Sequence, residues 1–239
     1  MSGIKAVFKK QLKDTYKNMA ILIQFLLFPA VAFITTELIA KTDDTMPNSM
    51  FATMMASIFA GMGLIPLVAS IIAEDRERKS LRFLVMAGVK PSAYLLGIGT
   101  VILLASVLPA IAFSLIADFR GHDFWIFTAV IMSGVSASIL IGAIIGIVSE
   151  NQQAATGLSM PVAMIFGFGP MIAQFNEQAA QIFRFLYSQQ FNIVANGLGF
   201  AGGYDSGTNL WQSFGIMWAN VAIMVVLFVY FYVKKGLRG

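Results

Sequence analysis

Side chains that could carry out catalysis are scarce in this sequence of 239 residues. Cysteine is absent and His122 is the single histidine, so neither a thiolate metal site nor a two-histidine site can form within one chain. His122 stands between Asp118 and Asp123, where we interpret it as a solvated loop residue. Glu37 is the one carboxylate near an apolar stretch that could serve ion-coupled transport. The sequence therefore predicts no catalytic residue, no metal ligand and no cofactor on this chain.

Charged residues are concentrated instead between positions 74 and 90. Two acidic residues, at 74 and 75, stand four residues before two basic ones, at 78 and 79, which is the spacing at which opposite charges pair along a helix. Apolar residues at 81, 84 and 85 fall on one face, and a connector between two membrane spans needs no such face. We therefore predict an amphipathic helix that contacts a partner protein. The residues assigned to this contact are Glu74, Asp75, Glu77, Arg78, Ser80, Leu81, Arg82, Leu84, Val85 and Gly88.

The rest of the chain is strongly apolar: 58% of its residues are hydrophobic and 12% charged, with a mean hydropathy of +0.78. Soluble domains have roughly 45–50% apolar and 25% charged residues, which excludes an ordinary soluble fold. A bilayer core about 30 Å thick needs ~20 apolar residues in helical form. Six stretches meet this requirement, at residues 19–40, 50–73, 93–117, 124–148, 154–175 and 211–233. We expect one all-α membrane domain over residues 1–239, with no separate catalytic domain.

Residues 176–210 form the longest predicted connection, on the external side. Its uncharged part is rich in polar residues and glycine, too polar to lie in lipid, and we interpret it as a loop with one short helix. Before it, residues 177–187 have the pattern of an amphipathic helix at the outer membrane interface.

The distribution of charge predicts the orientation. In the six-span arrangement one side holds 13 basic and five acidic residues, and the other holds three basic and seven acidic residues. The positive-inside rule places both termini on the cytoplasmic side of the cell membrane. Residues 1–18 repeat lysine every four positions from Lys5 to Lys17, with apolar residues on another face, which predicts an interfacial helix on the inner leaflet. This helix serves as a lipid anchor, a contact to a cytoplasmic partner, or both. We assign the net charge of +4 to this role and not to nucleic-acid binding.

Over its whole length the sequence resembles the permease subunits of type 2 ABC transporters, exporters with a transmembrane fold like that of the G subfamily. In that family, span 2 ends in a charged cluster with a pattern like Glu-x-Glu-x-Gly-Thr-x-Glu-x-Leu, followed by a small-residue turn and Pro or Ser before span 3. The matching positions here are Glu74, Glu77, Leu81, Leu84, Gly88, Pro91 and Gly97. Three positions differ, because Lys79-Ser80 stands where the family has Gly-Thr and Arg82 where it has Glu.

The resemblance implies that residues 74–90 form a coupling helix that docks onto a separate ATP-binding cassette subunit. ATP and magnesium would bind to that subunit, since this chain has no Gly-x-x-x-x-Gly-Lys phosphate loop. The resemblance also implies a second permease copy, in a homodimer or a heterodimer. The second cytoplasmic loop, with Glu150 and Asn151, faces the ATPase in this family, and the residues alone fit a simple hairpin connector equally well.

Methionine and phenylalanine side chains recur along spans 2 and 5. These side chains adapt to irregular apolar shapes, which is typical of a pathway for hydrophobic cargo and also of ordinary packing against lipid or core. The predicted pathway residues are Phe51, Met54, Met55, Ile58, Phe59, Met160, Met164, Phe168, Met171 and Phe175. Pro161 and the run at 167–170 predict a break or kink in span 5 that could act as a gate. In span 4, Gly142 and Gly146 predict a close approach of another helix of the same chain.

The favoured function is therefore export of a hydrophobic or amphipathic substrate, driven by a partner ATPase. A drug, a lipid-like molecule and an antimicrobial or cytolytic peptide remain equal candidates for the cargo. The alternative is an ion-coupled secondary transporter or channel without an ATPase partner, which the scarcity of charges within the spans disfavours.

Overall fold

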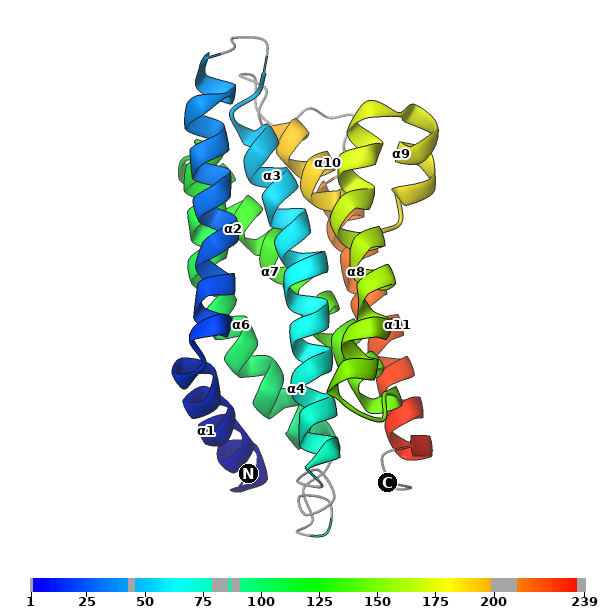
Figure 1. Ribbon diagram of the computed structural model, residues 1–239. Coiled ribbons are helices and arrows are strands. Elements are labelled where there is room, and N and C mark those ends of the chain that lie inside the picture. Colours follow the sequence, from blue (N-terminus) through cyan, green and yellow to red (C-terminus); the bar gives the residue numbers. More distant parts are fainter. Residues whose placement is uncertain (1, 43–45, 79–85, 87–90, 199–209, 236–239) are drawn as a thin grey trace.

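The computed structural model describes residues 2–42, 46–78, 86, 91–198 and 210–235. Every regular element in these ranges is a helix (Figure 1). The helices are α1 (Ser2–Lys17), α2 (Met19–Leu38), a 3₁₀ turn (Ala40–Thr42), α3 (Ser49–Ile58), a π-helix (Phe59–Leu64), α4 (Ile65–Glu77), α6 (Pro91–Ile116), α7 (Gly121–Val148), α8 (Gln152–Phe175), α9 (Glu177–Phe183), α10 (Gln189–Leu198) and α11 (Leu210–Lys235).

Six of these segments are long and apolar enough to cross a membrane, which confirms the predicted number of spans. They are Ile21–Thr42, Ser49–Glu77, Ala93–Ile116, Gly121–Val148, Gln152–Phe175 and Leu210–Tyr232. The start of α1, the end of α4 and the end of α11 lie at the same end of the bundle, which we call the basic end (Figure 1). Helices α9 and α10 lie toward the opposite end.

Helix α7 is the centre of the bundle, and it packs against α4, α6 and α11. A Cβ atom at Gly142 would lie 2.6 Å from the Ile65 carbonyl oxygen, and one at Gly146 would lie 2.7 Å from that of Ala69. The two glycines therefore let the backbones of α4 and α7 approach each other directly. The predicted use of this Gly-x-x-x-Gly motif for packing within the chain is confirmed.

The second span is a continuous helix with a widened π-helical section in its middle, from Phe59 to Leu64. Pro66 follows at the start of α4, and because proline has no N–H and its ring crowds the preceding turn, a regular α-helix cannot continue unchanged through this point. The Gly63 carbonyl oxygen accepts a hydrogen bond of 2.6 Å from Gln24 Nε2 of α2. Span 1 thus satisfies a backbone group in the irregular part of span 2.

The fifth span differs from the sequence expectation. Helix α8 runs without a break from Gln152 to Phe175, through Pro161 and Pro170. Asn192 Nδ2 of α10 donates a hydrogen bond of 3.1 Å to the Pro170 carbonyl oxygen, which ties this part of α8 to α10. The predicted break of span 5 is therefore wrong, and the alternative of a kink stays a prediction.

The connection between α8 and α11 contains two short helices. Helix α9 ends at Phe183, earlier than the predicted end at residue 187, and Asn176 caps its start by accepting a hydrogen bond of 3.1 Å from the Ala179 amide. Helix α10 contacts α3, α7, α8 and α11, and most of its residues are buried. The polar side chains of α10, those of Gln189, Gln190 and Asn192, are accordingly buried among the helices.

Candidate coupling and transport elements

The last turn of α4 is where the predicted contact segment meets the membrane helices. Asp75 is 7% exposed and forms an ion pair with Lys10 of α1. Its second carboxylate oxygen accepts a hydrogen bond of 3.0 Å from the hydroxyl of Tyr94, on α6. One carboxylate thus links α4 to two other helices, α1 and α6.

Arg76, the next residue, links α4 to α7. Its Nη1 atom donates to the carbonyl oxygens of Ile147, at 2.6 Å, and Ser149, at 2.9 Å. These carbonyls lie at the C-terminal end of α7, where the unpaired backbone oxygens and the helix dipole both favour a cation. The guanidinium group therefore fixes the end of span 2 to the end of span 4.

The end of α4 also contacts the loop between α7 and α8. The Gln152 amide donates to Glu77 Oε2 at 3.2 Å, and the Gln152 side chain donates to Ser70 Oγ at 2.7 Å. Asn151 caps α8 by accepting a hydrogen bond of 2.8 Å from the Ala154 amide. Glu150 is exposed in this loop. The two connections that were assigned to the cytoplasmic side are in direct contact with each other.

The predicted contact residues fall into two groups. Ser80, Leu81, Arg82, Leu84, Val85 and Gly88 lie outside the described residues. Among the described ones, Glu77 and Arg78 are exposed, and Arg78 pairs with Glu74 at 2.8 Å, the predicted spacing of four residues. Asp75 instead points into the bundle, so its contacts are with helices of its own chain.

The sequence reasoning missed Lys10, Tyr94, Arg76 and Gln152 as members of this network. Lys10 does not belong to the series of lysines at every fourth position of α1, and this was the one feature of the sequence that could have indicated a separate role for it. Its partner Asp75 is 65 positions away, and no sequence spacing indicates such a pair.

Helix α1 packs on α6 through one face. Val7, Gln11 and Thr15 are buried, and a Cβ atom at Gly97 of α6 would lie 2.6 Å from a Val7 methyl carbon, so Gly97 lets the two helices cross closely. Tyr16, on the predicted apolar stripe, is 77% exposed. The apolar stripe of α1 is thus largely exposed at this position and available to lipid.

The predicted pathway residues also divide into two groups. On α8, Met160, Met164 and Phe175 are exposed, the last by 74%. Phe168 and Met171 of α8 and Phe51, Met55 and Ile58 of α3 are partly buried. Met54 and Phe59 are buried, and the Phe59 ring packs against three other phenylalanine rings of the chain, with centroids 5.5–5.9 Å apart. The side chains of Met54 and Phe59 therefore pack inside the bundle and do not face its surface.

A buried polar cluster surrounds the start of α10. Ser57 Oγ donates to the Ser188 carbonyl oxygen at 3.4 Å, and the hydroxyls of Tyr187 and Ser138 lie 2.8 Å apart. Gln190 Nε2 donates to the Arg184 carbonyl oxygen at 2.6 Å. Burial raises the pKa of the Tyr187 phenol far above its usual value, so this hydroxyl stays protonated. Polar side chains thus hold the turn before α10 between spans 2 and 4.

The fold and these contacts define a polytopic helical membrane protein whose basic end is a network of charged and polar contacts, the kind of structure expected of a transporter subunit. A family model described as ABC-2 family transporter protein matches residues 4–230. The chain belongs to this family and is the permease, or membrane component, of an ABC transporter, which implies an ATP-binding cassette partner. The search of curated proteins found no match.

Proposed function

We propose that this permease is an exporter subunit, with its basic end in the cytoplasm and a separate ATPase docked on residues 74–90. ATP and magnesium bind to that ATPase, and the permease converts its nucleotide-driven motion into movement of the spans. The positive charge of the basic end supports this orientation.

The observation that carries the proposal is the set of contacts at the end of α4. Asp75, Arg76 and Glu77 are consecutive, and only Arg78 separates them from residues 79–90. They contact α1 and α6, the end of α7, and the start of α8 respectively. A displacement of the docked segment therefore acts on five helices at once, counting α4 itself. A simple connector between spans 2 and 3 would have no need of these contacts.

We further propose that two permease copies, identical or different, face each other through spans 2 and 5. The exposed apolar side chains of α8 support this part, because Met160, Met164 and Phe175 have no partner within the described chain that covers them. A hydrophobic or amphipathic substrate would pass along this face, where flexible methionines adapt to different shapes.

The docking proposal is tested by coexpression with the candidate ATPase and purification of the complex. Replacement of Leu81, Leu84 and Val85 by serine should abolish copurification and the stimulation of ATP hydrolysis. The matched control replaces Ile182 and Phe185, exposed apolar residues in and just after α9, by serine and should leave both unchanged. A loop variant that binds and stimulates the ATPase like the wild type would refute docking on this segment.

The dimer proposal is tested by disulfide cross-linking, for which the absence of native cysteine is an advantage. Met164→Cys in α8 should form a cross-linked dimer on mild oxidation in membranes. Ile34→Cys in α2 is the control, because Ile34 is 53% exposed and Met164 is 52% exposed. Equal cross-linking of the two variants, or none at Met164, would contradict a dimer through span 5.

A further inference from the structure

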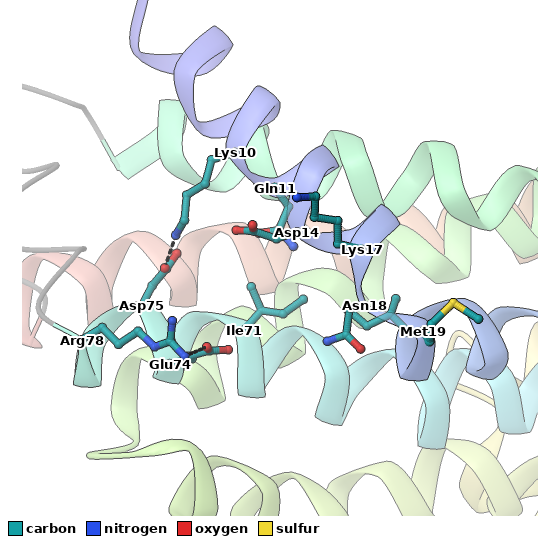
Figure 2. Close-up of a pocket in the computed structure, with 11 residues that line it drawn as sticks. Lys10, Gln11, Asp14, Lys17, Asn18, Met19, Ile71, Glu74, Asp75 and Arg78 are labelled. Atoms are coloured by element: carbon teal, nitrogen blue, oxygen red, sulfur yellow. Dashed lines mark hydrogen bonds and ion pairs between the residues drawn. The ribbon is translucent and has the colours of Figure 1, made fainter.

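A cleft of about 780 Å³ separates α1 from the end of α4 (Figure 2). Charged side chains of both helices line it, and so do Met19 and Ile21 of α2. Figure 2 shows Lys10, Asp75 and Arg78 toward one end of the cleft and Met19 toward the other. Ile71 of α4 adds an apolar side chain to its wall. The cleft therefore runs from a charged region to an apolar one at the point where a span begins.

The charges in the cleft are balanced. Lys10, Lys17 and Arg78 provide three positive groups, and Asp14, Glu74 and Asp75 provide three negative groups. Two pairs are internal to the protein, Lys10 with Asp75 and Arg78 with Glu74 (Figure 2). For Asp14 and Lys17, the structure shows no side-chain hydrogen bond or ion pair to any described residue. One carboxylate and one ammonium group thus remain in the cleft to bind a ligand.

The position of these two groups limits the class of ligand. They are three residues apart on α1, so they lie on neighbouring parts of one helix face, and the apolar end of the cleft adjoins them. A phospholipid has the same order of polarity, with a charged headgroup above apolar chains. Tyr16, on the apolar stripe of α1, is 77% exposed, which is consistent with lipid next to this helix.

We propose that the cleft binds the headgroup of phosphatidylethanolamine, with its ammonium group on Asp14 and its phosphate on Lys17. A zwitterionic headgroup supplies one partner for each free charge and keeps the cleft neutral. An anionic lipid such as phosphatidylglycerol would satisfy Lys17 and leave the Asp14 carboxylate unpaired. The quaternary ammonium of phosphatidylcholine has no N–H to donate, so it makes no hydrogen bond to Asp14.

The test is native mass spectrometry of the purified chain, released from micelles that contain equal amounts of phosphatidylethanolamine, phosphatidylcholine and phosphatidylglycerol. The wild type should retain phosphatidylethanolamine about tenfold more than the other two, the factor that corresponds to about 1.4 kcal/mol for one additional charged hydrogen bond. Asp14→Asn should remove this preference, and Lys17→Gln should lower the retention of all three lipids. Lys13→Gln is the control, since Lys13 is an exposed lysine of α1 that does not line the cleft.

Equal retention of the three lipids by the wild type, or an unchanged preference in Asp14→Asn, would overturn the proposal. If Asp14→Asn fails to fold, the proposal is tested on the wild type alone, by measuring the retention of phosphatidylethanolamine and of its mono-, di- and trimethylated derivatives. Retention should persist as long as the headgroup keeps one N–H and should fall for the trimethylated lipid. Equal retention of all the derivatives would contradict binding of the ammonium group to Asp14. The sample contains no ATPase, so the result is independent of the proposed coupling function.

Discussion

The direct backbone contact between α4 and α7 makes a prediction for Gly142→Ala. The added methyl carbon would lie 2.6 Å from the Ile65 carbonyl oxygen and 2.8 Å from the Val68 Cβ atom. Ordinary contacts begin near 3.4 Å, so the two helices must separate by about 0.8 Å at this turn. Such overpacking costs about 1–3 kcal/mol. We expect Gly142→Ala to lower the midpoint of thermal unfolding, measured in detergent micelles by tryptophan fluorescence.

The matched control is Gly215→Ala in α11, where an added Cβ meets no atom of the structure within 4 Å. This variant gains up to about 1 kcal/mol of helix propensity without a clash, so its midpoint should stay equal or rise. The second contact, at Gly146, lies one turn away on the same face. Since one clash already separates the helices, the double variant should lose less than the sum of the single losses. If Gly142→Ala unfolds at the same temperature as Gly215→Ala, the helices do not pack through their backbones here.

Three further predictions concern the polar contacts. Arg76→Met should lower the free energy of unfolding by about 1.5–3 kcal/mol per charged hydrogen bond lost, and Arg76→Lys should lower it by less, because lysine keeps the charge at the end of α7. Denaturant titration of both variants measures the difference. An unchanged stability of Arg76→Met would contradict the double contact, and equal losses in the two variants would contradict the contribution of the charge. Lys10→Met should destabilise the protein, because it removes the ammonium group that pairs with the buried Asp75 carboxylate, and Asp75→Asn in that background should recover part of the loss. A thermal-shift series that shows two independent, additive losses would refute the pairing. Burial raises the pKa of Tyr187, so Tyr187→Phe should leave the tyrosinate absorbance of the folded protein around pH 10 unchanged, and a decrease in that absorbance would show that this phenol titrates normally.

The membrane spans followed from the sequence because their signal is local. About 20 consecutive apolar residues dictate a helix in lipid, whatever the rest of the chain does. The close helix packing at Gly142 and Gly146 could also be predicted from the sequence, because two glycines four residues apart leave a groove that a neighbouring helix can fill. The i, i+4 pair of Glu74 with Arg78 belongs to the same class of local information.

The remaining features depend on contacts between distant segments. Pro170 predicts a broken helix when its neighbours are unknown, but α8 packs against α3, α4 and α10 and continues through this residue. The inward orientation of Asp75 likewise depends on Lys10 and Tyr94, neither of which is adjacent in sequence. The placement of α10 among the spans depends on carbonyl acceptors at Arg184 and Pro170, which satisfy side chains that would be too polar for lipid.

The hydrogen bond from Gln24 to Gly63 affects how the first two spans insert into the membrane during synthesis of the protein. The glutamine amide lies within the first span, and its acceptor is a backbone oxygen in the middle of the second. Either group alone in hydrocarbon is costly, and together they satisfy each other. The first two spans should therefore leave the insertion machinery as a paired hairpin, with span 1 held at the protein-lined exit until span 2 has been synthesised.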